Sequence, residues 1–294
     1  MSAESQAFKL ALCQMLVTDD KTANLEKAAD FLRRAKQADA KIAVLPECFQ
    51  CPYDTACFRA YSETLPDPPY PVSKQHESPS LKVLQDLAQE TGMYIVGGSV
   101  PEISEGKVYN TSMTVSPTGG LIAKHRKTHL FDIDVPGGIK FKESDALTAG
   151  DSATAFHIPE LSLTAGVAIC YDMRFPELAM VQARQLNASL LIYPGAFNLT
   201  TGPAHWELLI RARALDNQVF VAACSPARAT SGDGYKAWGH SMVVDPWGKV
   251  VASTEEKESL VIADIHLSRV EQVRKAIPTS KQRRRDVYTL EYLK

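Results

Sequence analysis

Two pairs of similar segments recur in this chain, and they constrain its fold more than any other feature. The first pair lies at 109–123 (Tyr-Asn-Thr-Ser-Met-Thr-Val-Ser-Pro-Thr-Gly-Gly-Leu-Ile-Ala) and 238–252 (Trp-Gly-His-Ser-Met-Val-Val-Asp-Pro-Trp-Gly-Lys-Val-Val-Ala). The second lies at 40–49 (Ala-Lys-Ile-Ala-Val-Leu-Pro-Glu-Cys-Phe) and 188–197 (Ala-Ser-Leu-Leu-Ile-Tyr-Pro-Gly-Ala-Phe). Such repetition indicates one supersecondary unit that is used twice. The sequence therefore predicts two related halves, each ordered β-α-β-α-β-β.

A β-α-β-α-β-β half on its own would leave one face of its sheet bare. Two such halves cover these faces if they pack sheet against sheet, with the helices outside. We therefore predict an α/β fold, a four-layer αββα sandwich with two pseudo-symmetric halves.

Hydrophobic periodicity and capping residues predict the elements of each half. Strands are predicted at 8–17, 42–45, 93–100, 109–115 and 121–124, and then at 164–169, 189–193, 219–224, 239–244 and 260–265. Helices are predicted at 24–37, at 79–91 after the N-cap Ser78, from Pro176 onward and at 203–217. A last helix is predicted to open with a capping box formed by Ser268 and Glu271. Residues 125–150 are predicted to be irregular.

Composition and charge exclude several classes of protein. No Gly/Ser-rich linker interrupts the 294 residues, of which 45% are hydrophobic, so we predict one domain over 1–294, with its core at about 8–277 and a tail at 278–294. A net charge of −2 argues against nucleic acid or an anionic membrane as a partner. The N-terminus lacks the apolar stretch of a secretory signal, and no segment approaches the ~18 apolar residues of a membrane span. We expect a cytoplasmic protein, a mitochondrial location being left open, with six free cysteines.

Cys170 lies at the join between a predicted buried strand and a predicted helix. A residue on such a turn has its side chain pushed out of the sheet, and the nearby helix N-terminus stabilises an anion. A polar cluster follows directly: Tyr171, Asp172, Arg174 and Glu177. A buried, inert cysteine would not need such neighbours. The sequence favours Cys170 as a thiolate nucleophile.

A cysteine nucleophile needs a base that takes its proton and donors that stabilise an oxyanion. Glu47 follows the strand at 42–45 and Lys127 follows the strand at 121–124, so both are candidates at the edge of the sheet. A Cys–His arrangement is an alternative, and no spacing favours one base among His125, His129, His205 and His240.

A long Pro-rich loop follows Glu47, and loops of that length in a compact domain tend to be functional. Three cysteines cluster in it: Cys48, Cys51 and Cys57. Such a cluster suggests a zinc or redox site, but no second ligand pair follows at zinc-finger spacing and no helix clearly starts at Cys48. We therefore predict no metal site in this loop.

Three motifs resemble, in their order and spacing, the nitrilase superfamily of carbon–nitrogen hydrolases. They are Val-Leu-Pro-Glu-Cys-Phe around Glu47, Lys-His-Arg-Lys-Thr-His-Leu-Phe-Asp around Lys127, and Ile-Cys-Tyr-Asp-Met-Arg-Phe-Pro-Glu-Leu around Cys170. The resemblance covers residues 8–290, and the segments at 193–207 and 237–248 are similar to the omega-amidase branch. That branch deamidates short 2-oxo dicarboxylic acid monoamides such as 2-oxoglutaramate and 2-oxosuccinamate.

The resemblance implies a role for each of these side chains. Glu47 would be the general base and acid, Lys127 the electrostatic stabiliser, and Cys170 the nucleophile of a thioester mechanism that requires no metal or organic cofactor. Glu143 matches a second family glutamate that positions the lysine or the substrate. The backbone N–H of Tyr171 would form an oxyanion hole together with Lys127.

A substrate carboxylate would need a cationic partner in the site. Arg174 is the candidate, because guanidinium binds carboxylate in a bidentate fork. Its alternative role is an ion pair with Asp172 or Glu177. Three further residues follow a predicted strand and are predicted to line the acyl pocket: Phe197, Thr200 and Thr201.

Other functions are compatible with the same set of residues. The closest alternative is a related hydrolase that acts on a deaminated-glutathione-like amide, an N-carbamoyl compound or a nitrile. A non-catalytic interaction protein that retains the fold is the alternative from another class. The resemblance also implies at least a homodimer, with the segment at 278–294 as an interface element.

Overall fold

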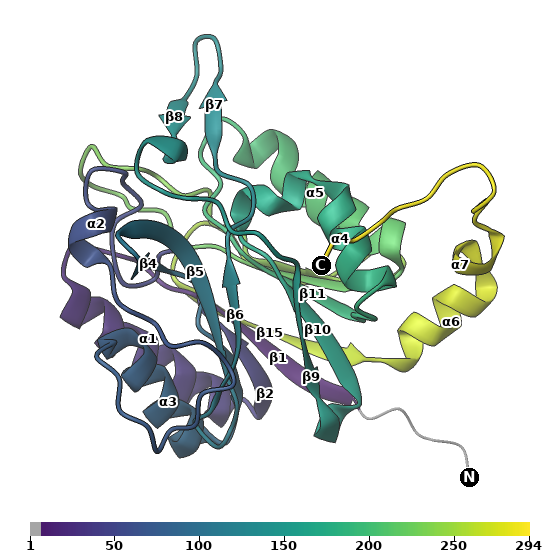
Figure 1. Cartoon of the computed structure of the whole chain (residues 1–294), viewed down its shortest axis with the longest axis horizontal. Helices are drawn as coiled ribbons and strands as arrows, with labels where there is room; N and C mark the ends of the chain where they lie inside the picture. Colours follow the sequence, from purple (N-terminus) through teal and green to yellow (C-terminus); the bar gives the residue numbers. More distant parts are fainter. Residues whose placement is uncertain (1–6) are drawn as a thin grey trace.

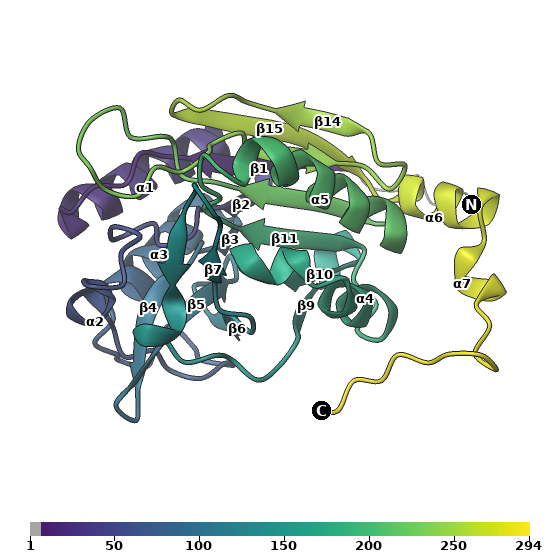
Figure 2. The same cartoon turned by 90° about the horizontal axis from the view of Figure 1, so that it is seen from above.

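Two β-sheets packed face to face form the centre of the molecule in the computed structural model, which describes residues 7–294 (Figures 1 and 2). The first sheet has the order β15 (Ser259–His266), β1 (Ala7–Gln14), β2 (Ala40–Val44), β3 (Tyr94–Val96), β5 (Lys107–Val115) and β4 (Val100–Ser104), and β6 (Leu121–Arg126) also pairs with β5. The second has the order β14 (Val250–Ser253), β13 (Met242–Val244), β12 (Phe220–Cys224), β11 (Leu190–Pro194), β10 (Leu163–Val167) and β9 (Thr154–Ile158). A separate hairpin of β7 (Asp132–Asp134) and β8 (Lys140–Lys142) projects from the body, at the top of Figure 1.

Helices cover the outer faces of the two sheets. Helices α1 (Lys21–Gln37) and α3 (Pro79–Thr91) pack on the first sheet through side chains such as Leu32 and Leu84. Helices α4 (Pro176–Arg184) and α5 (Gly202–Asn217) pack on the second, where Trp206 and Ile210 are buried. The remaining helices are short: α2 (Phe58–Tyr61), α6 (Ser268–Ala276), α7 (Thr279–Gln282) and the 3₁₀ turns η1 (Glu143–Asp145), η2 (Pro159–Leu161) and η3 (Cys170–Arg174). No helix within residues 7–294 is long and apolar enough to cross a bilayer.

Apolar side chains from both sheets meet between them and form the central core. Leu10 and Leu12 of β1, Ile42 of β2 and Ile192 of β11 are fully buried there. Because burial of apolar surface contributes about 25 cal/mol per Å², this shared face holds the two sheets together. The predicted four-layer αββα sandwich is confirmed.

The two halves share their topology, as the repeated segments predict. Strand β15 pairs antiparallel with β1 at the edge of the first sheet, and β9 pairs antiparallel with β10 at the edge of the second. The hairpin β5–β6 has a register shift between Thr114 and Val115, and β13–β14 has one between Val243 and Val244. These two shifts fall at matching positions of the repeated segments 109–123 and 238–252. The repetition thus extends to a local irregularity of the backbone.

Two stretches differ from the prediction for reasons of backbone geometry. The strand predicted at 93–100 is divided into β3 and β4 at Gly97–Gly98. Gly98 has a φ of 50°, and a Cβ on it would lie 2.0 Å from the carbonyl oxygen of Pro46, so the chain turns there in a way that only glycine permits. Residues 125–150, predicted to be irregular, contain the β7–β8 hairpin and η1.

The capping prediction was correct for one helix and wrong for another. Ser78 caps α3, its Oγ accepting a hydrogen bond from the backbone N–H of Leu81 at 3.0 Å. The box predicted for Ser268 and Glu271 does not form. The backbone is already helical at Leu267, so Ser268 lies inside α6 and there is no side-chain cap.

Candidate active site

Glu47 lies shortly after β2, and its carboxylate is buried. Asn110 Nδ2 at 2.9 Å and Lys127 Nζ at 3.0 Å donate to its Oε1. The backbone N–H of Ala196, just after β11, donates to Oε2 at 2.8 Å. One carboxylate therefore joins the ends of both sheets, and these donors fix its orientation.

Lys127 follows β6 and is fully buried between two carboxylates. Its Nζ lies 3.0 Å from Glu47 Oε1 and 2.9 Å from Glu143 Oε1. Burial by itself would lower the pKa of Lys127, but the charges of Glu143 and Glu47 outweigh it and raise that pKa well above its usual value. The ammonium therefore stays charged throughout the physiological pH range.

Glu143 opens η1 and is fully buried on the far side of Lys127. The hydroxyl of Tyr53 donates to its Oε1 at 2.6 Å, and the backbone N–H of Phe131 donates to its Oε2 at 2.6 Å. From the residues alone Glu143 is an ordinary loop acid, and the position beside the lysine agrees with the implication of the family resemblance.

Cys170 opens η3 with a φ of 46°, in the left-handed region that residues other than glycine rarely adopt. Such backbone strain clusters at active sites. Gly195, just after β11, faces the turn, and a Cβ on it would lie 3.2 Å from Cys170 Cα. The strained turn therefore has room because its neighbour has no side chain.

The Glu47 carboxylate and the Cys170 thiol perturb each other. Burial is the largest cause that raises the pKa of Glu47, and the charge of Lys127 opposes it. Burial also raises the pKa of Cys170 well above its usual value; the negative charge of Glu47 adds to this, and Lys127 again opposes it. The resting site thus holds a neutral thiol beside a carboxylate that can take its proton.

Asp172 connects the nucleophile turn to the segment that carries Lys127. It is fully buried, and its Oδ2 accepts from the backbone N–H of Ile169 at 3.0 Å, immediately before Cys170. Its Oδ1 accepts from the backbone N–H of His129 at 2.8 Å, two residues after Lys127. Hydrogen bonds from the histidine rings overcome burial and hold the pKa of Asp172 far below its usual range. One carboxylate thereby fixes the Cys170 turn and the Lys127 segment to each other.

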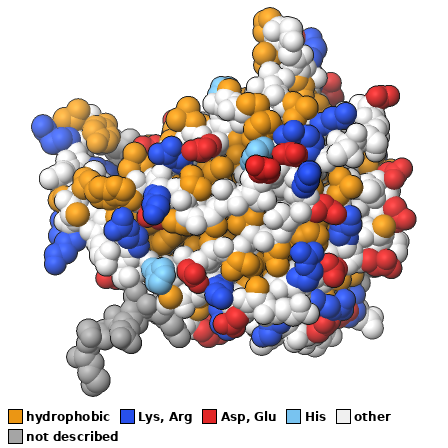
Figure 3. Space-filling model, turned by 180° about the vertical axis from the view of Figure 1, so that it is seen from behind, with side chains coloured by type: hydrophobic (Ala, Val, Ile, Leu, Met, Phe, Trp, Pro, Cys, Tyr) orange, Lys and Arg blue, Asp and Glu red, His pale blue; other side chains and the backbone are white. Residues whose placement is uncertain are grey.

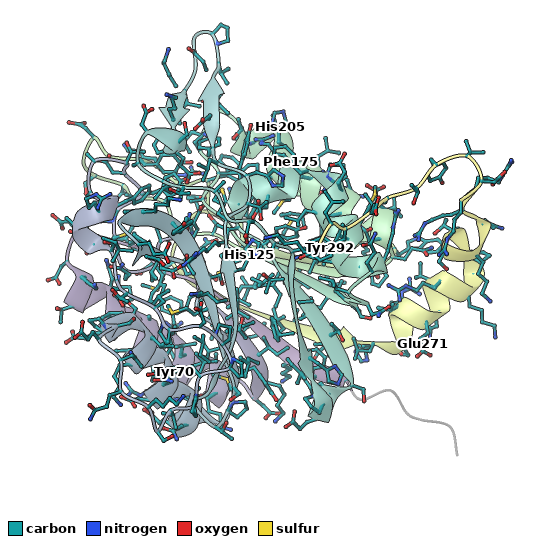
Figure 4. All side chains as sticks on the ribbon, in the orientation of Figure 1. Tyr70, His125, Phe175, His205, Glu271 and Tyr292 are labelled. Atoms are coloured by element: carbon teal, nitrogen blue, oxygen red, sulfur yellow. The ribbon has the colours of Figure 1, made fainter. Side chains whose placement is uncertain are left out.

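The four histidines considered as a base for Cys170 contact partners other than its thiol. His125 Nε2 and His129 Nδ1 lie 3.1 and 2.8 Å from the Asp172 carboxylate. His205 contacts Arg174, and His240 stacks on a tryptophan ring. Figure 4 shows His125 near the middle of the molecule and His205 at the α5 side. Within residues 7–294 none of these rings hydrogen-bonds to Cys170, so the geometry does not support a Cys–His arrangement.

Arg174 is partly buried and lies against two aromatic rings. Its guanidinium carbon is 4.9 Å from the ring centroid of Phe197 and 5.6 Å from that of Tyr171. Its Nη1 lies 3.2 Å from His205 Nδ1. Among the described residues it forms no ion pair with Asp172 or with Glu177, so its charge is not used by a neighbouring acid.

The residues predicted to line the acyl pocket lie in the turn between β11 and α5. Phe197 is buried and packs edge to face on Trp206, with ring centroids 5.0 Å apart. Thr200 is exposed, and its methyl lies 3.1 Å from where a Cβ on Gly138 of the β7–β8 turn would be. Thr201 is buried at the start of α5, with its backbone N–H bonded to Asn198. Their contact with a substrate stays a prediction.

A cavity of about 710 Å³ opens beside Glu47, a size typical of small-molecule sites. Its inner wall includes Glu47, Tyr53, Ala196 and Tyr235, and its outer wall includes residues 16–19 and 229–234. The Tyr235 hydroxyl donates to the carbonyl oxygen of Ala196, which ties the outer loop to the end of β11. This wall does not include Lys127, Cys170 or Arg174. Nor does it include the predicted pocket residues Phe197, Thr200 and Thr201.

Sequence reasoning missed two side chains that touch the charged groups. Asn110 supports Glu47, and Tyr53 supports Glu143. Tyr53 lies in the long loop whose length predicted a function. Asn110 lies in a repeated segment, and the matching position of the other copy is Gly239. This difference between the two copies is the signal that could have indicated a role for Asn110.

The cysteine cluster shows no sign of a metal site. All six cysteines are free, Cys48 and Cys51 being buried and Cys57 half-buried. Within residues 7–294 no group of three or more His, Cys, Asp and Glu side chains is placed to hold a metal ion.

Known proteins match this chain over nearly its whole length. The model of the carbon–nitrogen hydrolase family matches residues 9–275. Omega-amidase NIT2-B of Xenopus laevis is 50% identical over 284 residues, which cover 97% of this chain and 98% of that protein. Human omega-amidase NIT2 is 48% identical over 288 residues, which cover 98% and 99%.

A solved structure shows the same fold. Nit3 of Saccharomyces cerevisiae, described as a member of branch 10 of the nitrilase superfamily, superimposes with a TM-score of 0.85 at 45% identity, covering 97% of this chain and 99% of Nit3. The family match, the relatives and the fold agree. The chain therefore belongs to the carbon–nitrogen hydrolase family of the nitrilase superfamily and is an enzyme of that family.

Proposed function

We propose that this enzyme is an omega-amidase, which hydrolyses the terminal amide of short 2-oxo dicarboxylic acid monoamides such as 2-oxoglutaramate and 2-oxosuccinamate. The observation that carries the proposal is the buried ion pair of Glu47 and Lys127 beside the strained turn of Cys170. The Cα of Cys170 lies against Gly195, and the next residue, Ala196, donates its backbone N–H to Glu47. Relatives that are 48–50% identical over nearly the whole chain and are named omega-amidases support the choice of substrate class.

In the first step the sulfur of Cys170 attacks the amide carbon while its proton passes to the Glu47 carboxylate. A C–S bond forms, and the carbonyl electron pair moves onto the oxygen. The Lys127 ammonium and the backbone N–H of Tyr171 stabilise this oxyanion. The Tyr171 N–H suits that role because it lies in the first turn of η3, where N–H groups have no partner within the helix.

In the second step protonated Glu47 gives its proton to the amide nitrogen. The C–N bond breaks, ammonia leaves, and the acyl group remains on Cys170 as a thioester. Water then attacks the thioester carbon and gives a proton to Glu47. When the C–S bond breaks, that proton returns to the sulfur, so the acid is released and the resting site is restored.

Arg174 is the group that we propose to bind the substrate carboxylate. Its guanidinium has no carboxylate partner among the described residues, and the rings of Phe197 and Tyr171 hold it in place. A bidentate contact to the carboxylate would orient the distal amide toward Cys170. An Arg174→Lys variant keeps the charge but loses the fork, so we expect KM for 2-oxoglutaramate to rise.

The test is a substrate panel with the purified protein and ammonia release as the readout. The panel contains 2-oxoglutaramate, 2-oxosuccinamate, a deaminated-glutathione-like amide, an N-carbamoyl amino acid and an aliphatic nitrile. We expect kcat/KM to be highest for the two oxo-acid amides. Nitrile turnover without amide turnover would refute the proposal, and no turnover of either oxo-acid amide would do the same.

We further propose that the chain forms a homodimer through its C-terminal segment at 278–294. This segment carries three large, strongly exposed apolar side chains: Val287 (67%), Tyr288 (59%) and Leu293 (87%). In Figure 1 this segment extends from α7 at the right edge of the molecule and returns toward α4, and the edge that carries α6 and α7 projects at the left in Figure 3. Light scattering after size exclusion should give twice the chain mass, and deletion of 287–294 should give the monomer mass.

A further inference from the structure

The buried hydroxyl of Tyr53 contacts the charged residues of the site but has no role in the mechanism above. Tyr53 lies in the loop between Glu47 and α2 and is 8% exposed. Its hydroxyl donates to Glu143 Oε1 at 2.6 Å and lies 3.4 Å from Lys127 Nζ. It is therefore in contact with the lysine and with Glu143, one of the two carboxylates beside that lysine.

Aromatic packing fixes the ring that carries this hydroxyl. Phe141 of β8 stacks on it at 5.4 Å with an interplanar angle of 18°, and Phe58 of α2 packs edge to face at 5.8 Å. Tyr235 lies at 4.7 Å on the cavity side. Three contacts from separate elements leave the hydroxyl little freedom, so its position is determined independently of the ammonium.

The two carboxylates beside Lys127 have matching sets of donors. Oε1 of Glu47 accepts from Lys127 and Asn110, and Oε1 of Glu143 accepts from Lys127 and Tyr53. Each Oε1 thus has one neutral donor beside the ammonium, and a backbone N–H donates to the Oε2 of each acid. Without the Tyr53 donor, Glu143 would depend on the ammonium more strongly than Glu47 does, and the charge would be drawn away from the reacting atoms.

We propose that Tyr53 is a positioning residue, which balances Glu143 against Glu47 so that the Lys127 ammonium stays beside Glu47 and faces the developing oxyanion. The inference rests on the proposed function. Burial, followed by the charges of Glu143 and Glu47, raises the pKa of Tyr53 well above its usual value, so the hydroxyl stays a donor at every working pH.

The experiment compares Tyr53→Phe with Tyr94→Phe, a matched control. Tyr94 is also 8% exposed, and its hydroxyl donates to a carboxylate, Glu160, at 2.7 Å. Glu160 has no part in the site. We expect Tyr53→Phe to lower kcat on 2-oxoglutaramate about 10- to 100-fold with less than a threefold change in KM, as for a lost hydrogen bond to a charged group. Tyr94→Phe should stay within about twofold of the wild type.

A second measurement does not require amide turnover. Iodoacetamide alkylates a cysteine only after its thiol has lost the proton. Mass spectrometry of the peptide that contains Cys170 measures the alkylation rate of this cysteine separately from the other five. We expect Tyr53→Phe to slow alkylation about tenfold relative to Tyr94→Phe, with the same thermal midpoint. If the protein does not hydrolyse 2-oxoglutaramate, the proposed function is refuted. The alkylation rates of the two variants still test the role of Tyr53 in that case.

Two results would overturn the inference. One is that both variants match the wild type in kcat and in alkylation rate. The other is that Tyr53→Phe loses activity only in proportion to a lowered thermal midpoint, because the tyrosine would then support the fold and not the position of the ammonium.

Discussion

The two halves of the molecule have the same topology but place different residues at matching positions. The repeated segments 40–49 and 188–197 match Glu47 to Gly195. In the first half this position carries the buried carboxylate of the site. In the second half Gly195 leaves this position empty, and a Cβ there would make a tight contact of 3.2 Å with the Cα of Cys170. One backbone position thus carries the Glu47 carboxylate in one copy and leaves space beside Cys170, the proposed nucleophile, in the other.

The nucleophile itself has a counterpart that can be found from the strand register. Leu12 of β1 pairs with Val44, and Val167 of β10 pairs with Ile192. Val44 and Ile192 match in the repeated segments, so Cys170, three residues after Val167, corresponds to Met15, three residues after Leu12. Met15 is fully buried in the apolar core under α1 and α3.

The comparison teaches that the site is asymmetric although its scaffold is not. The charged residues Glu47, Lys127 and Glu143 all precede β9, and the nucleophile follows it. The site forms where the ends of β2, β6, β10 and β11 meet, so it needs both sheets. At matching positions of the two halves, one residue can therefore belong to the site while the other packs in the core.

Replacing the nucleophile should have the largest effect. In Cys170→Ala no C–S bond can form, so we expect the rate of ammonia release from 2-oxoglutaramate to fall by about 10⁴-fold or more. The circular dichroism spectrum should not change, because alanine removes a single atom. Residual amide hydrolysis near the wild-type rate would mean that another group attacks the substrate.

Replacing the acid by its neutral isostere should have the next largest effect. Glu47→Gln keeps the shape of the side chain but cannot take the thiol proton, and general-base catalysis contributes typically 10²- to 10⁴-fold. We expect kcat to fall within that range and the alkylation of Cys170 by iodoacetamide to slow in parallel. An unchanged alkylation rate would separate Glu47 from the deprotonation of the thiol.

Much of this site could be predicted because its central residues follow strands. Glu47, Lys127 and Cys170 each come after an apolar run, and the ends of neighbouring strands meet at the edge of a sheet. The fold was also predictable, because the repeated segments indicate that one β-α-β-α-β-β unit occurs twice. The apolar periodicity also placed α1 and α3 within a few residues.

The supporting residues could not be predicted in the same way. Tyr53 and Asn110 act through contacts with partners 90 and 63 positions away in the sequence, and no local pattern encodes such contacts. The prediction failed at Ser268 because the helix begins one residue earlier than its capping pattern suggests. Short-range signals therefore point to the proposed reacting residues better than to the side chains that support them.

Filling the empty position in the second half should have a moderate effect. In Gly195→Ala the new methyl meets Cys170 Cα at 3.2 Å and Trp206 Cζ3 at 3.3 Å, so the nucleophile must shift by a few tenths of an ångström. We expect kcat to fall about 10- to 100-fold, since small displacements of reacting groups are costly. The control is Gly138→Ala, whose methyl would meet Val135 of the β7–β8 turn and the methyl of Thr200 at the same distance of 3.1 Å. Equal activity of both variants would show that the gap at Gly195 is not needed.

The pH dependence should reflect the acid that only the first half carries. Glu47 must be ionised to accept the thiol proton, and its pKa is raised by burial. We expect kcat/KM to fall about tenfold per pH unit below a midpoint that lies above the usual range of a glutamate. In Asn110→Ala the carboxylate loses a donor, so this midpoint should move to higher pH. A midpoint that Asn110→Ala leaves unchanged would assign the acid limb to another group.

Replacing the counterpart of the nucleophile should have the smallest effect on activity and a large one on stability. Met15→Ala leaves a cavity in the core under α1, and such a truncation costs about 2–5 kcal/mol in the free energy of unfolding. Urea unfolding should show that loss, while kcat at 25 °C stays within about twofold of the wild type. Cys170→Ala should show the reverse, with native stability and no activity. If Met15→Ala instead lowered kcat without destabilising the fold, the division between a catalytic copy and a packing copy of this position would be wrong.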